Sequence, residues 1–270
     1  MVIHMHMNFM QCFYGIGVSI SPILMRIALE GQNWQYGYRL AFFLQLGLAL
    51  IGIVSIPLWR KLHPKTEGKT AEKKDKILSI RQMLKMPAVR WTCLFFFSAC
   101  AVELTCGIWC STFLVETKHI LPANAASFAL CYYLGVAFGR LVSGFLSQKL
   151  SSRKLILLGF GILIAATLLL LLPLPEFFCV AALFLIGFGI GPLFPNMMHL
   201  TGKIFSPEIA LSISGIQMTA TYTGILLMPA FFGLLAQYIS SGLYAWYILF
   251  LTIVTILAFH GVGQTARRSS

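Results

Sequence analysis

The chain has 270 residues, of which 58% are hydrophobic and only 10% charged, and its formal net charge is +12. An ordinary globular domain carries about 25% charged residues, so this composition excludes a soluble protein. The basic residues lie in short loops between apolar segments and not on one amphipathic face, which argues against a nucleic-acid partner and for the lipid bilayer.

Apolar segments of spanning length follow one another along the whole chain. The longest stretch without any acidic or basic residue runs from 209 to 266, enough for two crossings of ~20 residues each and the turn between them. We therefore predict an all-α integral membrane protein with eight transmembrane helices. They are expected near residues 8–28, 38–59, 90–115, 122–147, 154–174, 177–200, 209–237 and 241–262.

The distribution of Lys and Arg predicts the orientation of these helices. Ten of the 20 basic residues fall between Arg60 and Arg90, and most others lie in loops on the same side of the predicted topology. Basic residues are retained in short cytoplasmic loops. We expect a multi-pass protein of the cell membrane with both termini in the cytoplasm.

The segment from Arg60 to Arg90 is the long hydrophilic connection of the chain. Its second half places Ile77, Ile80 and Leu84 at helical spacing, which predicts a short amphipathic helix on the inner membrane surface that ends before Pro87. A flexible tether with some helical turns is an equally good interpretation of its composition.

The end of the fourth predicted helix carries a recognisable motif. It contains Gly139, Arg140 and Gly144, and then Gln148, Lys149 and Arg153 in the loop that follows. This pattern resembles the cytoplasmic loop signature of the major facilitator superfamily, with Gln148 in the place of the family's acidic residue. Arg140, about two turns from the inner interface, is interpreted as a cytoplasmic-side clamp.

Four further stretches are similar to the fucose permease-like branch of sugar transporters. They are residues 8–22, Glu103 with Trp109, residues 187–195, and residues 215–233. The resemblance implies a partial major facilitator fold, in which the first four helices are missing. It divides the chain into a remnant of the amino-terminal bundle (1–60), a basic cytoplasmic linker (61–89), the complete six-helix carboxy-terminal bundle (90–262) and a cytoplasmic tail (263–270).

Glu103 is the acidic residue that stands inside an apolar segment, and it is the first candidate for binding or coupling. A charge near the centre of a bilayer costs at least ~2.5 kcal/mol, so this carboxylate must face the bundle interior, a partner or water. A structural hydrogen bond to a neighbouring helix is the alternative.

Other candidates for contact with a solute come from the later helices. Gln217 offers donors and an acceptor suited to a sugar, although hydrogen bonding between helices explains it equally well. Trp109 and Tyr133 could stack on a sugar ring or serve packing. Gly191, Pro192 and Pro195 predict a break in the sixth helix beside a cavity, with Asn196 just beyond it.

The sequence lacks the usual enzyme and nucleotide-binding motifs, and His4 and His6 make too weak a pair for a metal site. We therefore expect no enzyme activity, no cofactor and no metal. The predicted function is secondary active transport of a small polar solute, a sugar in the first place, by alternating access, as symport with a proton or sodium ion or as uniport. The alternative is a truncated remnant that does not transport, or a membrane interaction protein.

Overall fold

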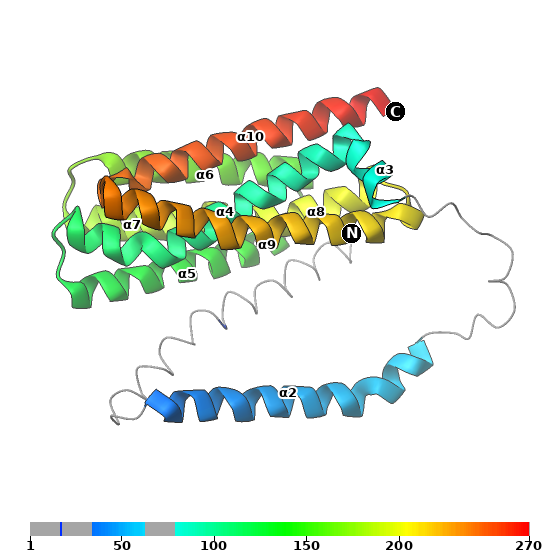
Figure 1. The fold of residues 1–270 in the computed structure, drawn as a ribbon, viewed down its shortest axis with the longest axis horizontal. Coiled ribbons are helices and arrows are strands. Elements are labelled where there is room, and N and C mark those ends of the chain that lie inside the picture. The colour runs from blue at the N-terminus through cyan, green and yellow to red at the C-terminus, as the bar shows by residue number, and fades with distance from the viewer. Residues whose placement is uncertain (1–16, 18–33, 63–78, 270) are drawn as a thin grey trace, which may run out of the picture. The chain divides into compact units, whose positions relative to one another are not determined.

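The computed structural model describes residues 17, 34–62 and 79–269. The predicted first helix, 8–28, lies outside the described residues apart from Gly17. The described helices are α2 (Trp34–Leu62), α3 (Ile80–Lys85), α4 (Pro87–Glu116), α5 (Pro122–Leu146), α6 (Ser152–Leu171), α7 (Glu176–Ile190), α8 (Leu193–Ile204), α9 (Pro207–Tyr238) and α10 (Tyr244–Ser269), with one 3-10 turn at Ser241–Leu243 (Figure 1).

Seven segments of the described chain are long and apolar enough to cross a membrane, with α7 and α8 together forming one of them. This confirms the all-helical membrane class and agrees with seven of the eight predicted spans. The boundaries shift by a few residues, because α4 begins at Pro87 and α10 continues to Ser269. The segment 263–270, predicted to be a tail, is thus helical as far as Ser269, since its residues from Gln264 on contain no helix breaker.

Helix α2 belongs to a compact unit that is separate from the other helices. Its apolar side chains are exposed on every side of the helix, as at Leu48, Leu50 and Ile53. A helix that is hydrophobic all round is typical of a membrane span.

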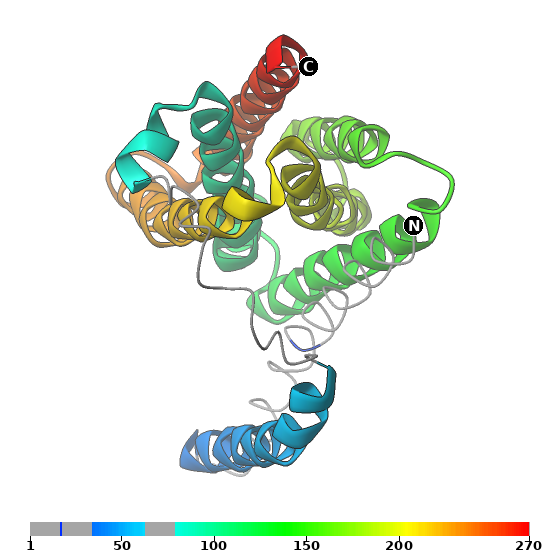
Figure 2. The same cartoon turned by 90° about the vertical axis from the view of Figure 1, so that its right-hand side faces the viewer.

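Helices α3 to α10 form the second unit, a bundle with two packed groups of helices. In the first group α4 packs against α9 and α10, and in the second α5 and α6 pack against α7, while α8 packs against α6. Figure 2, a view along the bundle, shows α4, α9 and α10 on one side and the green helices α5, α6 and α7 on the other. The rings of Phe95, Phe160 and Phe259 join α4, α6 and α10 across the two groups.

Glycines let the backbones of α5 and α7 touch. A Cβ atom at Gly139 would overlap the carbonyl oxygen of Phe188, and one at Gly191 would lie 2.7 Å from the carbonyl oxygen of Val136 and 2.9 Å from the backbone nitrogen of Arg140. Small residues are the usual means of such close approach between membrane helices. The backbone of Arg140 is therefore fixed directly against the end of α7.

The break between α7 and α8 falls at Gly191 and Pro192, where the sequence predicts it. Pro192 has no backbone N–H to continue α7. Its carbonyl oxygen accepts a hydrogen bond of 2.7 Å from Asn196 Nδ2. Pro195 lies in the first turn of α8, where an N–H has no partner inside the helix and its loss costs nothing.

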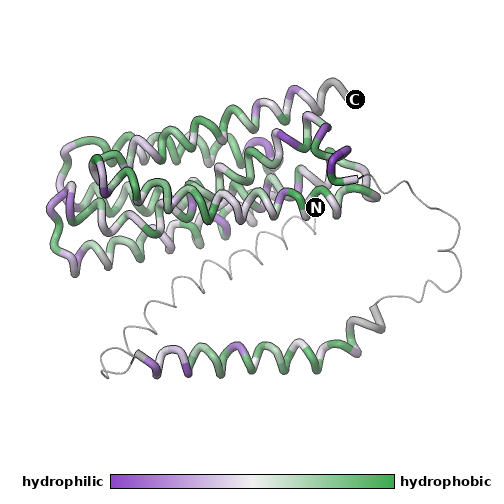
Figure 3. The backbone as a smooth tube through the Cα atoms, viewed as in Figure 1, coloured by the Kyte–Doolittle hydropathy of each residue, from purple (hydrophilic) through white to green (hydrophobic). Residues whose placement is uncertain are grey.

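Hydrophilic residues gather at the ends of the bundle and apolar residues along its length (Figure 3). At one end α3 lies in the predicted linker, over nearly the residues that the pattern of Ile80 and Leu84 indicates. Met83 of α3 is buried there against Val89, Phe205 and Ile213, which come from α4, the end of α8 and α9.

Candidate functional site

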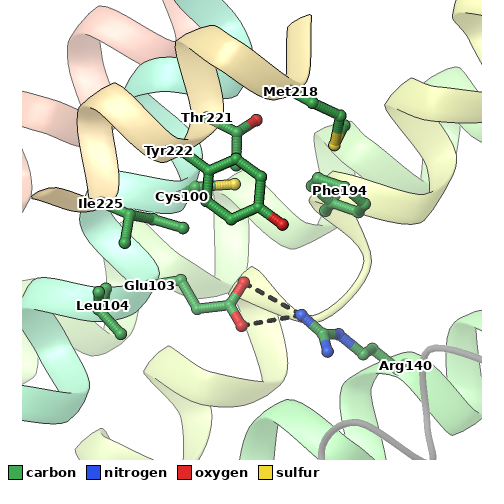
Figure 4. A pocket seen from close by; sticks show the side chains of 9 residues that line it. All are labelled: Cys100, Glu103, Leu104, Arg140, Phe194, Met218, Thr221, Tyr222 and Ile225. Carbon is green, nitrogen blue, oxygen red and sulfur yellow. Dashed lines mark hydrogen bonds and ion pairs between the residues drawn. The ribbon is translucent and has the colours of Figure 1, made fainter. Parts of the chain in front are cut away.

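A cavity of about 230 Å³ lies between the two groups of helices, and we call it the Glu103 cavity. Helix α4 and helix α9 form one wall, and α5 and α8 the other (Figure 4). Its volume is somewhat below the usual range for small-molecule sites, about 300–1,000 Å³. The residues that line it are Cys100, Glu103, Leu104, Arg140, Phe194, Met218, Thr221, Tyr222 and Ile225.

An ion pair crosses this cavity from α4 to α5. Arg140 Nη2 donates to both carboxylate oxygens of Glu103, at 2.8 and 3.1 Å (Figure 4). Arg140 is 3% exposed and Glu103 is 18% exposed. Burial of a charge is costly without a close partner of opposite sign, so the ion pair stabilises the guanidinium in this position.

Two tyrosine hydroxyls hold the part of α4 that carries Glu103. Tyr132 Oη, from α5, donates to the backbone carbonyl of Glu103 at 2.6 Å, and Tyr244 Oη, from α10, donates to that of Cys106 at 3.1 Å. Both tyrosines are fully buried. A buried hydroxyl without a partner is costly, so these bonds fix the height and rotation of α4 beside the cavity.

The wall from α9 supplies the uncharged polar groups of the cavity. Thr221 Oγ1 donates to the carbonyl of Gln217 at 3.0 Å, and Tyr222 is 67% exposed beside it. The remaining lining is apolar or sulfur-bearing. The cavity thus combines one ionised pair with a few hydroxyls on an apolar wall, which is the usual make-up of a site for a small polar molecule.

Gln217 does not line the Glu103 cavity, although its neighbour Met218 does. Its side chain is fully buried, and Nε2 donates to Thr201 Oγ1 of α8 at 3.3 Å. Its Oε1 atom has no hydrogen-bond partner within the described residues. The structure therefore shows the hydrogen bond between helices that the sequence left open as an alternative.

Trp109 and Tyr133 also lie outside the residues that line this cavity. Trp109 Nε1 donates to the carbonyl of Pro229 at 3.0 Å, and its ring meets that of Phe232 edge to face. Tyr133 meets the ring of Tyr132, its neighbour on α5, edge to face, and its hydroxyl end lies against Gly107 of α4. Both positions are occupied by packing between helices.

Asn196 stands behind the cavity and not in it. Its Nδ2 atom donates to Ser143 Oγ of α5 at 2.8 Å as well as to Pro192, and its Oδ1 atom has no partner among the described residues. Ser143 lies one turn from Arg140, and Asn196 lies two residues from Phe194. Through its hydrogen bond to Ser143, Asn196 thereby connects the start of α8 to α5, the helix that carries Arg140.

The residues of the loop motif separate in space. Lys149 lies in the loop between α5 and α6, and Arg153 lies in the first turn of α6, where its guanidinium is 6.0 Å from the ring centre of Phe259. Gly144 is buried near the end of α5, and Gln148 is exposed in the loop. Arg140 lies apart from them, with its side chain on Glu103 in the cavity, and its role as a cytoplasmic-side clamp stays a prediction.

Sequence reasoning placed Glu103 in the site but missed the apolar lining from Leu104, Phe194, Met218 and Ile225. Helical spacing from Thr221 would have indicated Met218 and Ile225, which lie one turn to either side of it on α9. No cluster of three or more His, Cys, Asp or Glu side chains able to hold a metal occurs in the parts of the chain that the structure describes.

Comparisons with known proteins agree with this architecture. The profile of the Major Facilitator Superfamily matches residues 107–264. Bypass of stop codon protein 6 of Saccharomyces cerevisiae is 24% identical over 268 residues, covering 86% of this chain and 52% of that protein. A probable hexose phosphate transport protein of Chlamydia pneumoniae is 27% identical over 161 residues, covering 51% of this chain and 35% of that protein. The chain thus spans about half the length, or less, of the curated relatives that it matches.

Solved structures show the same fold. The crystal structure of the transporter FucP in its outward conformation superposes with a TM-score of 0.67 at 17% identity, covering 94% of this chain and 68% of that one. A second structure, of the Escherichia coli fucose:proton symporter FucP, gives the same TM-score at 16% identity. The profile match covers more than half of the residues, and the chain therefore belongs to the Major Facilitator Superfamily.

Proposed function

We propose that this protein is a secondary active transporter that moves a small polar solute, a sugar in the first place, across the cell membrane by alternating access. Membership of the superfamily supports transport, and the names of two similar proteins, a probable hexose phosphate transport protein and a fucose:proton symporter, support a sugar-like solute. The proposal includes no catalytic step and no cofactor.

The observation that carries the proposal is the ion pair of Glu103 and Arg140 in the wall of a cavity between spanning helices. Ionisable groups at membrane depth are costly and usually mark a solute or ion pathway. Arg140 can donate to hydroxyl, carbonyl or phosphate oxygens of a solute, whereas Glu103 accepts from its hydroxyl groups. Glu103 is also the group that would carry a coupling proton or meet a coupling sodium ion.

Alternating access needs helices that change their mutual position, and the cavity lies where such a change would act. Its two walls belong to the two packed groups of helices, and Glu103 and Arg140 stand on opposite walls. The break at Gly191 and Pro192 allows α8, which carries Phe194, to move without loss of backbone hydrogen bonds in α7.

The rival proposal is a membrane protein that carries no solute, either a remnant or a partner of other membrane proteins. In transporters of this architecture the solute site lies between two bundles, and six of the described spans belong to one unit. A direct measurement of solute uptake by this chain distinguishes the rival proposal from a transporter.

The test is uptake of a panel of radiolabelled sugars and sugar phosphates into vesicles that contain the purified 270-residue chain. We expect uptake of at least one of these solutes, and we expect Glu103→Gln and Arg140→Gln each to reduce it at least tenfold. Glu176→Gln is the matched control, because Glu176 is an exposed acidic residue in the first turn of α7, outside the cavity. Uptake that is absent for every solute, or that survives in both cavity variants, would count against the proposal.

A further inference from the structure

A compact basic surface lies at one end of the bundle, away from the Glu103 cavity. Helix α3 is held there by Met83, which is 3% exposed and packs against residues of α4, α8 and α9. A helix of six residues is unstable by itself in water. Its fixed position therefore depends on this packing and on the hydrogen bond from the backbone N–H of Ser79 to Gln82 Oε1, 2.9 Å long.

The other side chains of α3 form two adjacent stripes. Successive residues of a helix are about 100° apart, so Ile80 and Leu84 lie about 40° apart on one stripe, and Arg81 and Lys85 form a second stripe beside it. All four side chains are exposed, and Ile80 is 63% exposed. Met83 points into the bundle. Around the helix axis, Ile80 and Leu84 lie next to Met83, and Arg81 and Lys85 lie on the opposite side of the helix from it.

Neighbouring segments extend the basic stripe. Arg90 at the start of α4 and Lys203 near the end of α8 are exposed at the same end of the bundle. In sequence, residues 79–90 and 193–213 together contain Arg81, Lys85, Arg90 and Lys203, and one acidic residue, Glu208. The surface therefore carries a clear excess of positive charge at the level where the spanning helices begin and end.

We propose that this surface, formed by α3 with Arg90 and Lys203, binds the anionic surface of the bilayer. Ile80 and Leu84 enter the boundary between headgroups and acyl chains, while Arg81 and Lys85 extend along that boundary and pair with lipid phosphates. The combination of an exposed apolar stripe with a flanking basic stripe is that of interfacial helices, which bind by buried apolar area together with attraction to anionic lipids. Lys and Arg reach such phosphates by extending their long side chains from a buried stem.

The position of α3 gives this contact a structural consequence. Lys85 ends the helix, Met86 is extended, and Pro87 begins α4, the helix that carries Glu103. A bilayer contact on α3 thus fixes the starting point of the helix that forms one wall of the cavity.

The test is hydrogen exchange, by mass spectrometry, of the backbone amides of residues 80–86 in the full chain. The protein is placed in vesicles of phosphatidylcholine alone or of phosphatidylcholine with about one third phosphatidylglycerol. We expect exchange to be at least about fivefold slower in the anionic vesicles, because each basic residue near such a surface contributes roughly a factor of five. The slowing should diminish at high salt, since ions screen exposed charges.

Three variants make the result specific. R81Q with K85Q should abolish the difference between the two vesicles, and R81K with K85R should restore it, because the charge is kept. K154Q removes one exposed positive charge from α6 and should leave the difference unchanged. Equal exchange in both vesicles, persistence of the difference in R81Q with K85Q, or equal slowing by inorganic phosphate in neutral vesicles would each overturn the proposal.

Discussion

Removal of either partner of the Glu103–Arg140 ion pair should destabilise the bundle, and the two losses should be unequal. Glu103→Gln removes the ion-pair partner of a guanidinium that is 3% exposed, whereas Arg140→Gln removes the partner of a carboxylate that is 18% exposed. Water reaches the second group more easily and compensates part of its charge. We therefore expect Glu103→Gln to be the more damaging change.

The magnitude follows from the burial of the pair. Breaking a buried pair by removing one partner costs about 3–5 kcal/mol. We expect ~3 kcal/mol for Glu103→Gln and ~2 kcal/mol for Arg140→Gln, because Glu103 is partly hydrated. The double variant removes both charges of the pair, so its loss should also be only ~2 kcal/mol and not the sum of both.

Thermal unfolding of the purified protein in one detergent and at one scan rate, followed by circular dichroism, measures these losses. A domain of this size shifts its Tm by about 2–4 °C per kcal/mol, so Glu103→Gln should lower the Tm by ~6–12 °C. Independent sites add within about 0.5 kcal/mol. A double variant whose loss equals the sum of the single losses would refute the pairing, and a larger loss for Arg140→Gln would refute the argument from burial.

Two further predictions concern the packing of the helices. Gly139→Ala should lower stability by about 1–3 kcal/mol, because the new methyl group overlaps the carbonyl of Phe188. Gly161→Ala, at an exposed helical site with open space around it, should instead raise stability by roughly 0.5–1 kcal/mol, and the opposite signs in the same unfolding assay check the close approach. Thr201→Val removes the acceptor of Gln217 Nε2 and should cost about 1–3 kcal/mol, whereas Thr201→Ser, which keeps a hydroxyl, should recover most of that loss in the same assay.

The sequence predicted the spanning helices well because their signal is local. Twenty apolar residues cross a bilayer whatever their neighbours are, and a proline interrupts a helix wherever it stands in its interior. The seven described spans and the break at Gly191 and Pro192 depend only on such local facts. The start of α4 and the end of α10 differ from the predicted ends, since the ends of helices are set by weak preferences.

The cavity was harder to predict because it depends on the rotation of each helix against its neighbours. Glu103 was identified from its charge alone, but its partner was not, since depth in the membrane placed Arg140 near the inner interface. What turns Arg140 toward Glu103 is the close packing of α5 on α7 through Gly139 and Gly191. The role of Gln217 could not be decided either, because a sugar and the hydroxyl of Thr201 are equally good partners for an amide.

Because α5 and α7 contact each other through backbone atoms, we expect these two helices to move together as one rigid body. No side chains lie between Gly139 and the carbonyl of Phe188 that could deform and absorb a displacement. A shift of the Arg140 backbone is therefore passed along α7, which rises ~1.5 Å per residue, to Glu176 at its far end, roughly 20 Å away. A fluorescent or spin label on the exposed start of α7 should therefore report displacements of Arg140, and no probe needs to be placed in the cavity itself.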